Sequence, residues 1–351
     1  MSNTLMNDRV AFIGVGQAGG NIAVEFKNLG YTTFFINTSI EDLNTIKVDT
    51  RYKYHIPTAQ GCNKDRDKAK QYTKDYYEII SSQIATKFGN ITKLFFCFSM
   101  GGGTGSGISP LLINALSKKM QNVTFNAICI IPSDSESARI KFNAFNCYTE
   151  LKAIPYLSNV YFIDNNSVIN NDINIFPTAV NNLEFLNKQI AYRINDILSM
   201  CNPDTRGIID TEEIEELLKV NGNVLLADIR NEDVVVDNIF PSTKKGCQFL
   251  AYSLTNDKDY LQDKVEELFG KPLDVYKGYN NNNSFVAIFG LPFPDKRIED
   301  LVKSYENDIE KIDTIEDEEI NIEISKLPDL TKRRKVRLEK AKQMNALLDE
   351  L

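Results

Sequence analysis

Ser99-Met100-Gly101-Gly102-Gly103-Thr104-Gly105-Ser106-Gly107 is the stretch that decides the fold of this chain. Five glycines in the seven residues from Gly101 to Gly107 lose much conformational entropy on folding, and a purely structural loop rarely needs so many. Successive backbone amides in such a loop form a concave anion site, and the hydroxyls of Thr104 and Ser106 add donors. Because an apolar strand precedes the run (Lys93 to Ser99) and a helical pattern follows it (Pro110 to Met120), we predict a phosphate cradle between a strand and a helix.

A second glycine run, Gly14-Val15-Gly16-Gln17-Ala18-Gly19-Gly20-Asn21, lies between an expected strand, Val10 to Val15, and an expected helix, Ala23 to Leu29. It fits G-x-G-x-x-G, which is typical of dinucleotide sites and also of turns that only pack a helix on a strand. A dinucleotide site needs an acidic residue about 20 positions later for the ribose. The next strand ends in Asn37-Thr38-Ser39 instead, so a Rossmann NAD-dependent oxidoreductase stays a disfavoured alternative.

Strand and helix patterns alternate along the first half of the chain. Strands are expected at residues 33–36, 93–99, 124–131 and 160–163, with helices at 65–87 and 137–151 between them, which predicts a parallel sheet covered on both faces. A long apolar-periodic helix, Thr178 to Met200, follows as a connector. After it we expect helices at 211–220, 257–269 and 295–312 and strands at 224–229, 247–254 and 284–289, which form a smaller α/β domain. The predicted units are an N-terminal domain of residues 1–175, the connecting helix of residues 176–202, a smaller second domain of residues 203–325 and a tail of residues 326–351.

Composition excludes several classes of protein. The 351 residues are 42% hydrophobic and 25% charged, as in ordinary globular proteins. Apolar runs are far shorter than the roughly 20 residues of a membrane span, and the N-terminus has no signal-peptide pattern, so we expect a cytoplasmic protein without membrane contact. A single histidine disfavours histidine-based catalysis and metal binding, and six scattered cysteines are interpreted as reduced thiols. The net charge of −8 argues against nonspecific nucleic-acid binding by the whole surface.

The glycine run at Gly101 to Gly107 resembles the signature G-G-G-T-G-[ST]-G of the tubulin/FtsZ superfamily, and the resemblance extends over most of the chain. It implies an N-terminal Rossmann-like GTPase domain, a long central helix and a smaller C-terminal domain. It also implies GTP or GDP as the bound nucleotide and Mg²⁺ as the metal ion, without assigning a metal ligand.

The resemblance carries over individual nucleotide-contacting residues. Glu136 is similar to a ribose contact, Arg139 to a residue near the sugar and phosphates, and Asn165 to the residue that reads the guanine edge. On the central helix Asn187 fits the second guanine contact, with Asn181 and Asn182 as rivals. The full set implied by the resemblance is Gly16, Gln17, Ala18, Asn21, Asn37, Thr38, Gly61, Cys62, Asn63, Met100, Gly101, Gly102, Gly103, Thr104, Gly105, Pro132, Glu136, Arg139, Asn165 and Asn187.

Asp210 and Glu213 look like the family's pair of acidic residues that polarises the attacking water. The same Asp-x-x-Glu spacing before an apolar-periodic helix is also a capping box, and both interpretations can hold together. In the family the acidic loop lies at the pole opposite the nucleotide. Hydrolysis then requires a neighbouring subunit, and the head-to-tail contact that supplies it produces filaments when it does not close. The expected first partner of the chain is therefore another copy of itself.

In its length and its basic end, the chain looks more like the TubZ branch than like tubulin proper or cell-division FtsZ. TubZ filaments move plasmid or phage DNA through a DNA-bound adaptor, TubR. Seven basic and three acidic residues lie between Thr331 and Leu351, a net charge of 7 − 3 = +4. This tail is either a solvated helix or the adaptor-binding segment, and no direct sequence-specific DNA binding is expected. A filament GTPase of cell division or phage positioning remains an alternative.

Overall fold

The computed structural model describes residues 6–170, 179–201, 209–236, 240–241, 245–281 and 283–317. Strands and helices alternate through its first half, as the sequence predicts. These elements are β1 (Val10–Val15), α1 (Gly16–Asn28), β2 (Thr32–Asn37), α2 (Ile40–Thr45), β3 (Lys53–His55), α3 (Arg66–Lys87), β4 (Lys93–Ser99), α4 (Thr104–Lys119), β5 (Thr124–Ile131), α5 (Ala138–Lys152), β6 (Leu157–Asp164) and α6 (Asn165–Asn170).

The second half begins with a long helix and continues as a mixed α/β unit. Its elements are α7 (Ala179–Leu198), α8 (Thr211–Leu217), β7 (Gly222–Arg230), β8 (Asp233–Val236), β9 (Phe249–Leu254), α9 (Gln262–Phe269), β10 (Asp274–Tyr279), β11 (Phe285–Leu291) and α10 (Asp295–Asp317). The expected helix at 257–269 is divided into a short 3₁₀ turn, Asp257–Asp259, and α9. The predicted tail, residues 326–351, lies outside the described residues. No helix in the described ranges is long and apolar enough to cross a membrane.

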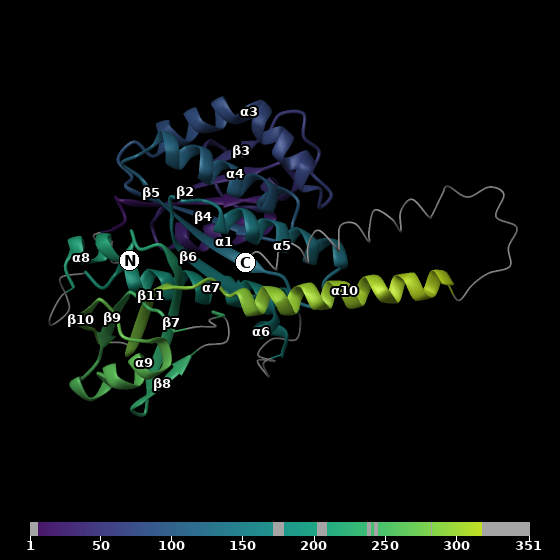
Figure 1. Cartoon of the computed structure of the whole chain (residues 1–351). Helices are drawn as coiled ribbons and strands as arrows, with labels where there is room; N and C mark the ends of the chain where they lie inside the picture. The colour runs from purple at the N-terminus through teal and green to yellow at the C-terminus, as the bar shows by residue number, and fades with distance from the viewer. Residues whose placement is uncertain are drawn as a thin grey trace, which may run out of the picture.

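One sheet runs through both halves of the molecule, in the order β10-β9-β11-β7-β6-β5-β4-β1-β2-β3, with β8 paired to β7 (Figure 1). The six strands from β3 to β6 are mutually parallel and have the doubly wound order 3-2-1-4-5-6. Beyond β7, antiparallel pairs with β11 and β8 make the C-terminal part mixed. In an open parallel sheet, ligands bind outside the carboxyl ends of the strands where the order reverses, which here is between β1 and β4.

Two apolar clusters cover the two faces of the parallel sheet. Alternate residues of β1 point to opposite faces, so Phe12 packs with α1 and α7 whereas Ile13 packs with α3, α4 and α5. The second cluster also contains Ile298, Leu301 and Val302 of α10. The C-terminal helix therefore lies against α5 of the first half, as Figure 1 shows.

Both glycine runs enter their helices earlier than the sequence predicts. The expected helix at Pro110 begins at Thr104, inside the signature, and the one expected at Ala23 begins at Gly16. Gly107 is consequently a packing residue, since a Cβ there would lie 2.7 Å from the Arg66 carbonyl oxygen and 2.8 Å from the Ala69 Cβ. The interpretation of all five glycines as a phosphate cradle is too broad, because at least this one serves the close contact of α4 with α3.

Candidate functional site

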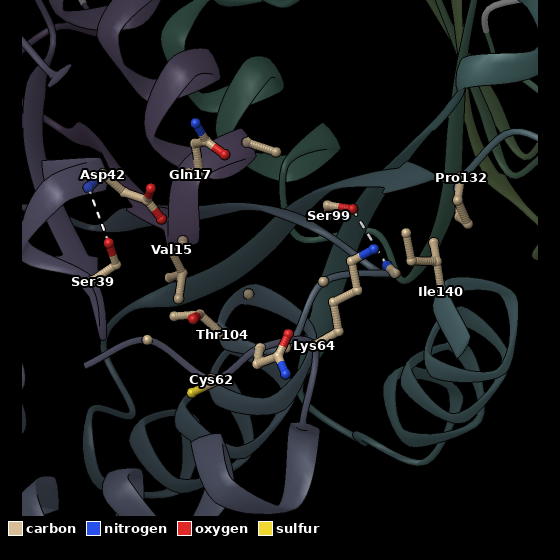
Figure 2. A pocket seen from close by; sticks show the side chains of 18 of the residues that line it. Val15, Gln17, Ser39, Asp42, Cys62, Lys64, Ser99, Thr104, Pro132 and Ile140 are labelled. Atoms are coloured by element: carbon tan, nitrogen blue, oxygen red, sulfur yellow. Dashed lines mark hydrogen bonds between the residues drawn. The ribbon is translucent and has the colours of Figure 1, made fainter. Parts of the chain in front are cut away.

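A cavity of about 340 Å³ opens at the carboxyl edge of the parallel sheet, at the reversal point between β1 and β4 (Figure 2). Every loop around it follows the end of a strand or precedes a helix. The cavity is lined by Val15, Gly16, Gln17, Ala18, Ser39, Asp42, Gly61, Cys62, Asn63, Lys64, Ser99, Gly101, Gly102, Gly103, Thr104, Gly105, Pro132, Glu136, Ile140 and Asn165.

Two helix N-termini meet at this cavity. In the described structure no side chain caps α1 or α4, and neither helix has an acidic residue in its first turn. By contrast α2, α3 and α8 are capped by Ser39, Asp65 and Asp210, whereas α5 and α9 also lack a side-chain cap. The first amides of a helix need an acceptor, and the helix dipole favours a negative one. The arrangement therefore fits a phosphate chain between α1 and α4.

The loop at residues 61–65 is pressed against the glycine signature. A Cβ on Gly103 would lie 2.8 Å from the Asp65 nitrogen and 2.9 Å from the Lys64 Cα, so only glycine permits this approach. Asn143 of α5 ties the two loops together, since its Nδ2 donates to the Lys64 carbonyl at 2.9 Å and to the Gly101 carbonyl at 3.0 Å. The loop that resembles the terminal-phosphate loop is thus held in place by backbone contacts and a buried amide.

Thr38 joins three of the loops through its hydroxyl group. Its Oγ1 lies 2.7 Å from Thr104 Oγ1 in the signature and accepts from Cys62 Sγ at 3.3 Å. Asn37 shapes the same loop, because its Oδ1 accepts from the Ser39 amide at 3.1 Å and its Nδ2 donates to Asp42 at 3.4 Å. Asn37 and Thr38 thus support the wall of the cavity from behind and do not line it themselves in the described structure.

The opposite wall of the cavity consists of Pro132, Glu136 and Ile140 after β5 and Asn165 after β6. Asn165 Oδ1 is buried and has no hydrogen-bond partner among the residues that the structure describes. An unpaired buried acceptor is costly unless a ligand supplies a donor. The N1–H and N2–H₂ groups of guanine are donors of this kind, so Asn165 fits the role that the resemblance implies.

Besides Asn37 and Thr38, four residues of the predicted set do not line the cavity as the described residues form it: Asn21, Met100, Arg139 and Asn187. Asn21 and Arg139 are exposed, Asn187 is half-buried on α7, and Met100 is buried with its amide bonded to the Ile130 carbonyl. The side chains of Asn181 and Asn182 lie outside the described residues. Sequence reasoning missed six lining residues, Val15, Ser39, Asp42, Lys64, Ser99 and Ile140, each within two residues of a predicted motif except Asp42. No three His, Cys, Asp or Glu side chains in the described ranges gather as a metal cage.

Asp210 and Glu213 form the predicted capping box at the start of α8. The Glu213 amide donates to Asp210 Oδ1 at 2.8 Å, and the Asp210 amide donates to Glu213 Oε2 at 2.7 Å. Two residues after Glu213, Glu215 pairs with Arg9, just before β1, and lies 3.7 Å from Lys93, the first residue of β4. The acidic pair is therefore at the amino edge of the sheet. Six residues of β1 separate it from the cavity, about 20 Å at 3.3 Å per residue.

Comparison with known proteins agrees with this geometry. Residues 9–172 match the GTPase domain of the tubulin/FtsZ family. The tubulin-like protein TubZ of Clostridium botulinum C phage is 31% identical over 301 residues, which cover 82% of this chain and 80% of the relative. The structure of the tail-truncated TubZ of C. botulinum phage c-st is similar with a TM-score of 0.77 at 27% identity, over 87% of this chain and 99% of that one.

A GTPγS-form protofilament of TubZ from Bacillus thuringiensis serovar israelensis has the same fold, with a TM-score of 0.75 at 16% identity over 89% and 97% of the two chains. The match to a GTPase domain overturns the oxidoreductase alternative. Although β2 itself does not end in an acidic residue, Asp42 of α2 supplies a carboxylate to the cavity. The parallel sheet with its glycine loops and the long helix α7 confirm the predicted fold class, and the chain belongs to the tubulin/FtsZ family as a GTPase that binds GTP and GDP.

Proposed function

We propose that this GTPase polymerises head-to-tail and hydrolyses GTP at the contact between subunits. The observation that carries the proposal is the separation of the two halves of the site on opposite edges of one sheet. One subunit cannot bring its own Asp210 and Glu213 to its own cavity, whereas a second copy stacked along the strand direction can. A contact of this kind is heterologous and extends into a filament.

Each wall of the cavity then has a separate task in phosphoryl transfer, which depends on positioning and on stabilising charge. Amides of Gly16 and of the signature from Gly101 to Gly105 cradle the phosphates, with the Thr104 hydroxyl as a further donor. Asn165 reads guanine and Glu136 contacts the ribose. Asp210 and Glu213 of the next subunit orient the attacking water and accept its proton.

Mg²⁺ fits the same cavity. This ion prefers oxygen ligands and is commonly held by one or two carboxylates together with the substrate phosphates. Asp42 is the carboxylate that lines the cavity beside the loops at Gln17 and Gly61, and it would hold the ion there. The ion would neutralise phosphate charge. The residues of the chain bind and orient the nucleotide and exclude water.

The cellular task that we propose is movement of plasmid or phage DNA in the cytoplasm, through a DNA-bound adaptor of the TubR type. Similarity to a phage TubZ over most of the chain supports it, as does the charge of +4 between Thr331 and Leu351. Deletion of Thr331 to Leu351 should abolish adaptor binding and spare assembly. A truncated chain that still binds the adaptor would remove the tail from this proposal.

The test of the enzymatic proposal is GTP hydrolysis measured against protein concentration, with light scattering recorded in parallel and ATP as the control nucleotide. We expect the rate per subunit to rise above a threshold concentration at which scattering appears, for GTP alone. A rate per subunit that does not depend on concentration would mean that the site is complete within one chain, and hydrolysis between subunits would be abandoned.

A further inference from the structure

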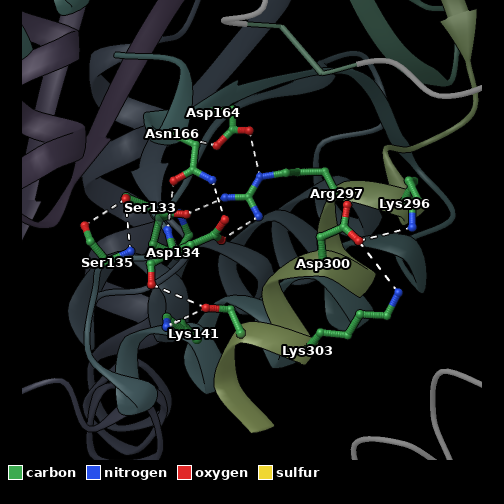
Figure 3. A network of polar contacts seen from close by, with 12 residues as sticks. Ser133, Asp134, Ser135, Lys141, Asp164, Asn166, Lys296, Arg297, Asp300 and Lys303 are labelled. Carbon is green, nitrogen blue, oxygen red and sulfur yellow. Dashed lines mark hydrogen bonds and ion pairs between the residues drawn. The ribbon is translucent and has the colours of Figure 1, made fainter. Parts of the chain in front are cut away.

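Arg297, in the first turn of α10, reaches the wall of the nucleotide cavity from the C-terminal helix (Figure 3). All three guanidinium nitrogens donate hydrogen bonds: Nε to Asp164 at 2.7 Å, Nη1 to Asp134 at 2.9 Å and Nη2 to the Pro132 carbonyl at 3.0 Å. The Arg297 side chain is 10% exposed. A buried fork with three oriented acceptors fixes the relative position of the groups that it joins.

The groups that Arg297 joins carry the two sides of the cavity wall. Pro132 itself lines the cavity at the end of β5, and Asp164 is the last residue of β6, directly before Asn165. Asn166 closes the same network, because its Nδ2 donates to Asp134 at 2.5 Å and its Oδ1 accepts from the Asp134 amide at 2.9 Å. The carboxyl ends of β5 and β6 are thus linked through one guanidinium.

Removing that guanidinium would leave Asp164 and the Pro132 carbonyl buried without their cation. Burial alone lowers the pKa of Arg297, but hydrogen bonds and charges from Asp164 and Asp134 outweigh it and hold the pKa above its ordinary value. The positive charge is therefore permanent, and it compensates two carboxylates, the buried Asp164 and the 41% exposed Asp134. Without it, their mutual repulsion and need for water would separate the two strand ends.

We propose that Arg297 is a positioning residue for the nucleotide: it sets the spacing between Pro132 and Asn165 and thereby couples the C-terminal helix to the sugar and base side of the cavity. The proposal rests on the function proposed above, in which this cavity holds GTP. Coupling between two sites is reciprocal, so nucleotide in the cavity strengthens docking of the first turn of α10 to the same extent that this docking strengthens nucleotide binding.

The chain offers a matched control at the same helix. Tyr148 of α5 donates to Asp295 at 2.5 Å, and Lys152 lies 2.9 Å from the same carboxylate. These contacts hold the start of α10 against α5 and do not touch the cavity loops. Tyr148→Phe therefore loosens the same end of α10 as Arg297→Gln, while the network of Asp134, Asp164 and Pro132 stays intact.

The experiment measures release of a fluorescent GDP analogue by the full-length chain below its assembly threshold, together with thermal unfolding of each variant. Arg297→Gln should accelerate release about tenfold, within the range typical of coupled sites. Arg297→Lys keeps the charge and loses the fork, so its release rate should fall between those of wild type and Arg297→Gln. Tyr148→Phe should change the rate less than twofold. An unchanged rate in Arg297→Gln, or equal acceleration in Tyr148→Phe at equal loss of thermal stability, would overturn the proposal.

Hydrogen–deuterium exchange of the wild-type chain gives a second test that does not depend on any variant. GDP should slow exchange at residues 295–300 as well as at 164–167, and unchanged exchange at 295–300 would contradict the coupling. Asn165→Ala and Gly103→Ala separate the two levels of the argument. If neither weakens nucleotide binding, the assignment of the cavity fails; if both do and Arg297→Gln does not, only the positioning role fails.

Discussion

At the residue scale, Asp210 and Glu213 cap α8 and, in the proposed mechanism, also orient the attacking water, and conservative substitutions separate these two roles. Asparagine caps a helix about as well as aspartate, and glutamine serves in a capping box as glutamate does, but neither carries a charge. We therefore expect Asp210→Asn and Glu213→Gln to keep the unfolding temperature of wild type and to lose GTP turnover by about 100-fold or more, the usual contribution of a positioned proton acceptor. Steady-state phosphate release and thermal unfolding measure the two effects.

Asp210→Ala is the matching control, since it removes cap and charge together. It should lose turnover and also about 1 kcal/mol of stability. If Asp210→Asn hydrolysed GTP at the wild-type rate, the pair would be a helix cap and nothing more.

Lys93 gives the chain a pH dependence at the amino edge of the sheet. Its side chain is 3% exposed, and burial lowers its pKa below 10.5 although Glu215 acts in the opposite direction. The unfolded chain then binds more protons than the folded one between the lowered pKa and 10.5, so the Lys93 contribution to stability rises with pH across that window. In urea titrations from pH 8 to pH 10, we expect the unfolding free energy of wild type to rise relative to that of Lys93→Met, by no more than about 1.4 kcal/mol per pH unit.

A pH-independent difference between the two proteins would show that Lys93 has the same proton affinity folded and unfolded. Arg51 provides the control position, because its exposed side chain contacts only Asp49 and the Tyr52 ring among the ionic and aromatic contacts of the described residues. Arg51→Met should leave the pH profile of wild type unchanged.

Residues that carry the site through their backbone were predictable, because glycine runs after strands have few other uses. Gly101 to Gly105 and Gly16 to Ala18 line the cavity as expected. Asp42 and Arg297 were not predictable, because each comes from an element whose own sequence carries no motif: Asp42 lines the cavity from α2, and Arg297 of α10 donates to the Pro132 carbonyl of the wall. Asn143 was not predictable either, since its role depends on hydrogen bonds to two carbonyl groups that lie 42 and 79 positions away in the chain.

At the scale of the element, α4 contains a proline that its surroundings accommodate. Pro110 lacks an N–H, so the Ser106 carbonyl loses its partner within the helix. Arg66 replaces that partner, because its Nη2 donates to the Ser106 carbonyl at 2.9 Å and its Nε donates to Ser106 Oγ at 3.1 Å. The same Nη2 pairs with Glu150 at 2.6 Å. This compensation satisfies the carbonyl that Pro110 leaves free inside a helix that begins at Thr104.

A double-mutant cycle tests the compensation. Arg66→Met should cost about 2 kcal/mol of stability, since it leaves the buried Ser106 carbonyl without its donor, whereas Glu150 keeps its ion pair with Lys70. In the background of Pro110→Ala the new amide can donate to the Ser106 carbonyl, so the loss should be smaller by about 1 kcal/mol. Urea unfolding of the four proteins gives the coupling. Additive losses would mean that Arg66 supports α4 only through Glu150.

Elements with a clear period were predicted well, and short edge elements were not. The strands at Val10–Val15, Lys93–Ser99 and Thr124–Ile131 have the predicted bounds because they are buried on both faces and read as continuous apolar runs. β3, β8 and β10 were missed, since these edge strands are short or largely exposed, and even the three valines of β8 are too few to indicate a strand. Their positions are set by pairing with β2, β7 and β9, which a single sequence does not reveal.

At the scale of the whole molecule, hydrolysis between subunits predicts that two inactive proteins restore each other. Asp210→Asn retains a cavity and lacks the acid, whereas Gly103→Ala retains the acid and should lose the nucleotide through the contact with Asp65 and Lys64. With random mixing in a head-to-tail chain, about a quarter of the contacts combine an intact cavity with an intact acid. We expect the mixture to hydrolyse GTP while each protein alone does not. Phosphate release from a mixture that stays at the sum of the separate rates would contradict shared sites.

The two edges of the central sheet differ in what they present, since one bears the cavity and the other the acidic pair. Any linear stack of such subunits has one tip whose cavity faces solvent and has no acid above it. With hydrolysis between subunits as proposed, the triphosphate at that tip stays intact until the next subunit arrives, and that arrival starts its hydrolysis. The time since a subunit was covered then determines how far its nucleotide has been hydrolysed. The ratio of di- to triphosphate therefore rises along the polymer from its fresh end to its old end.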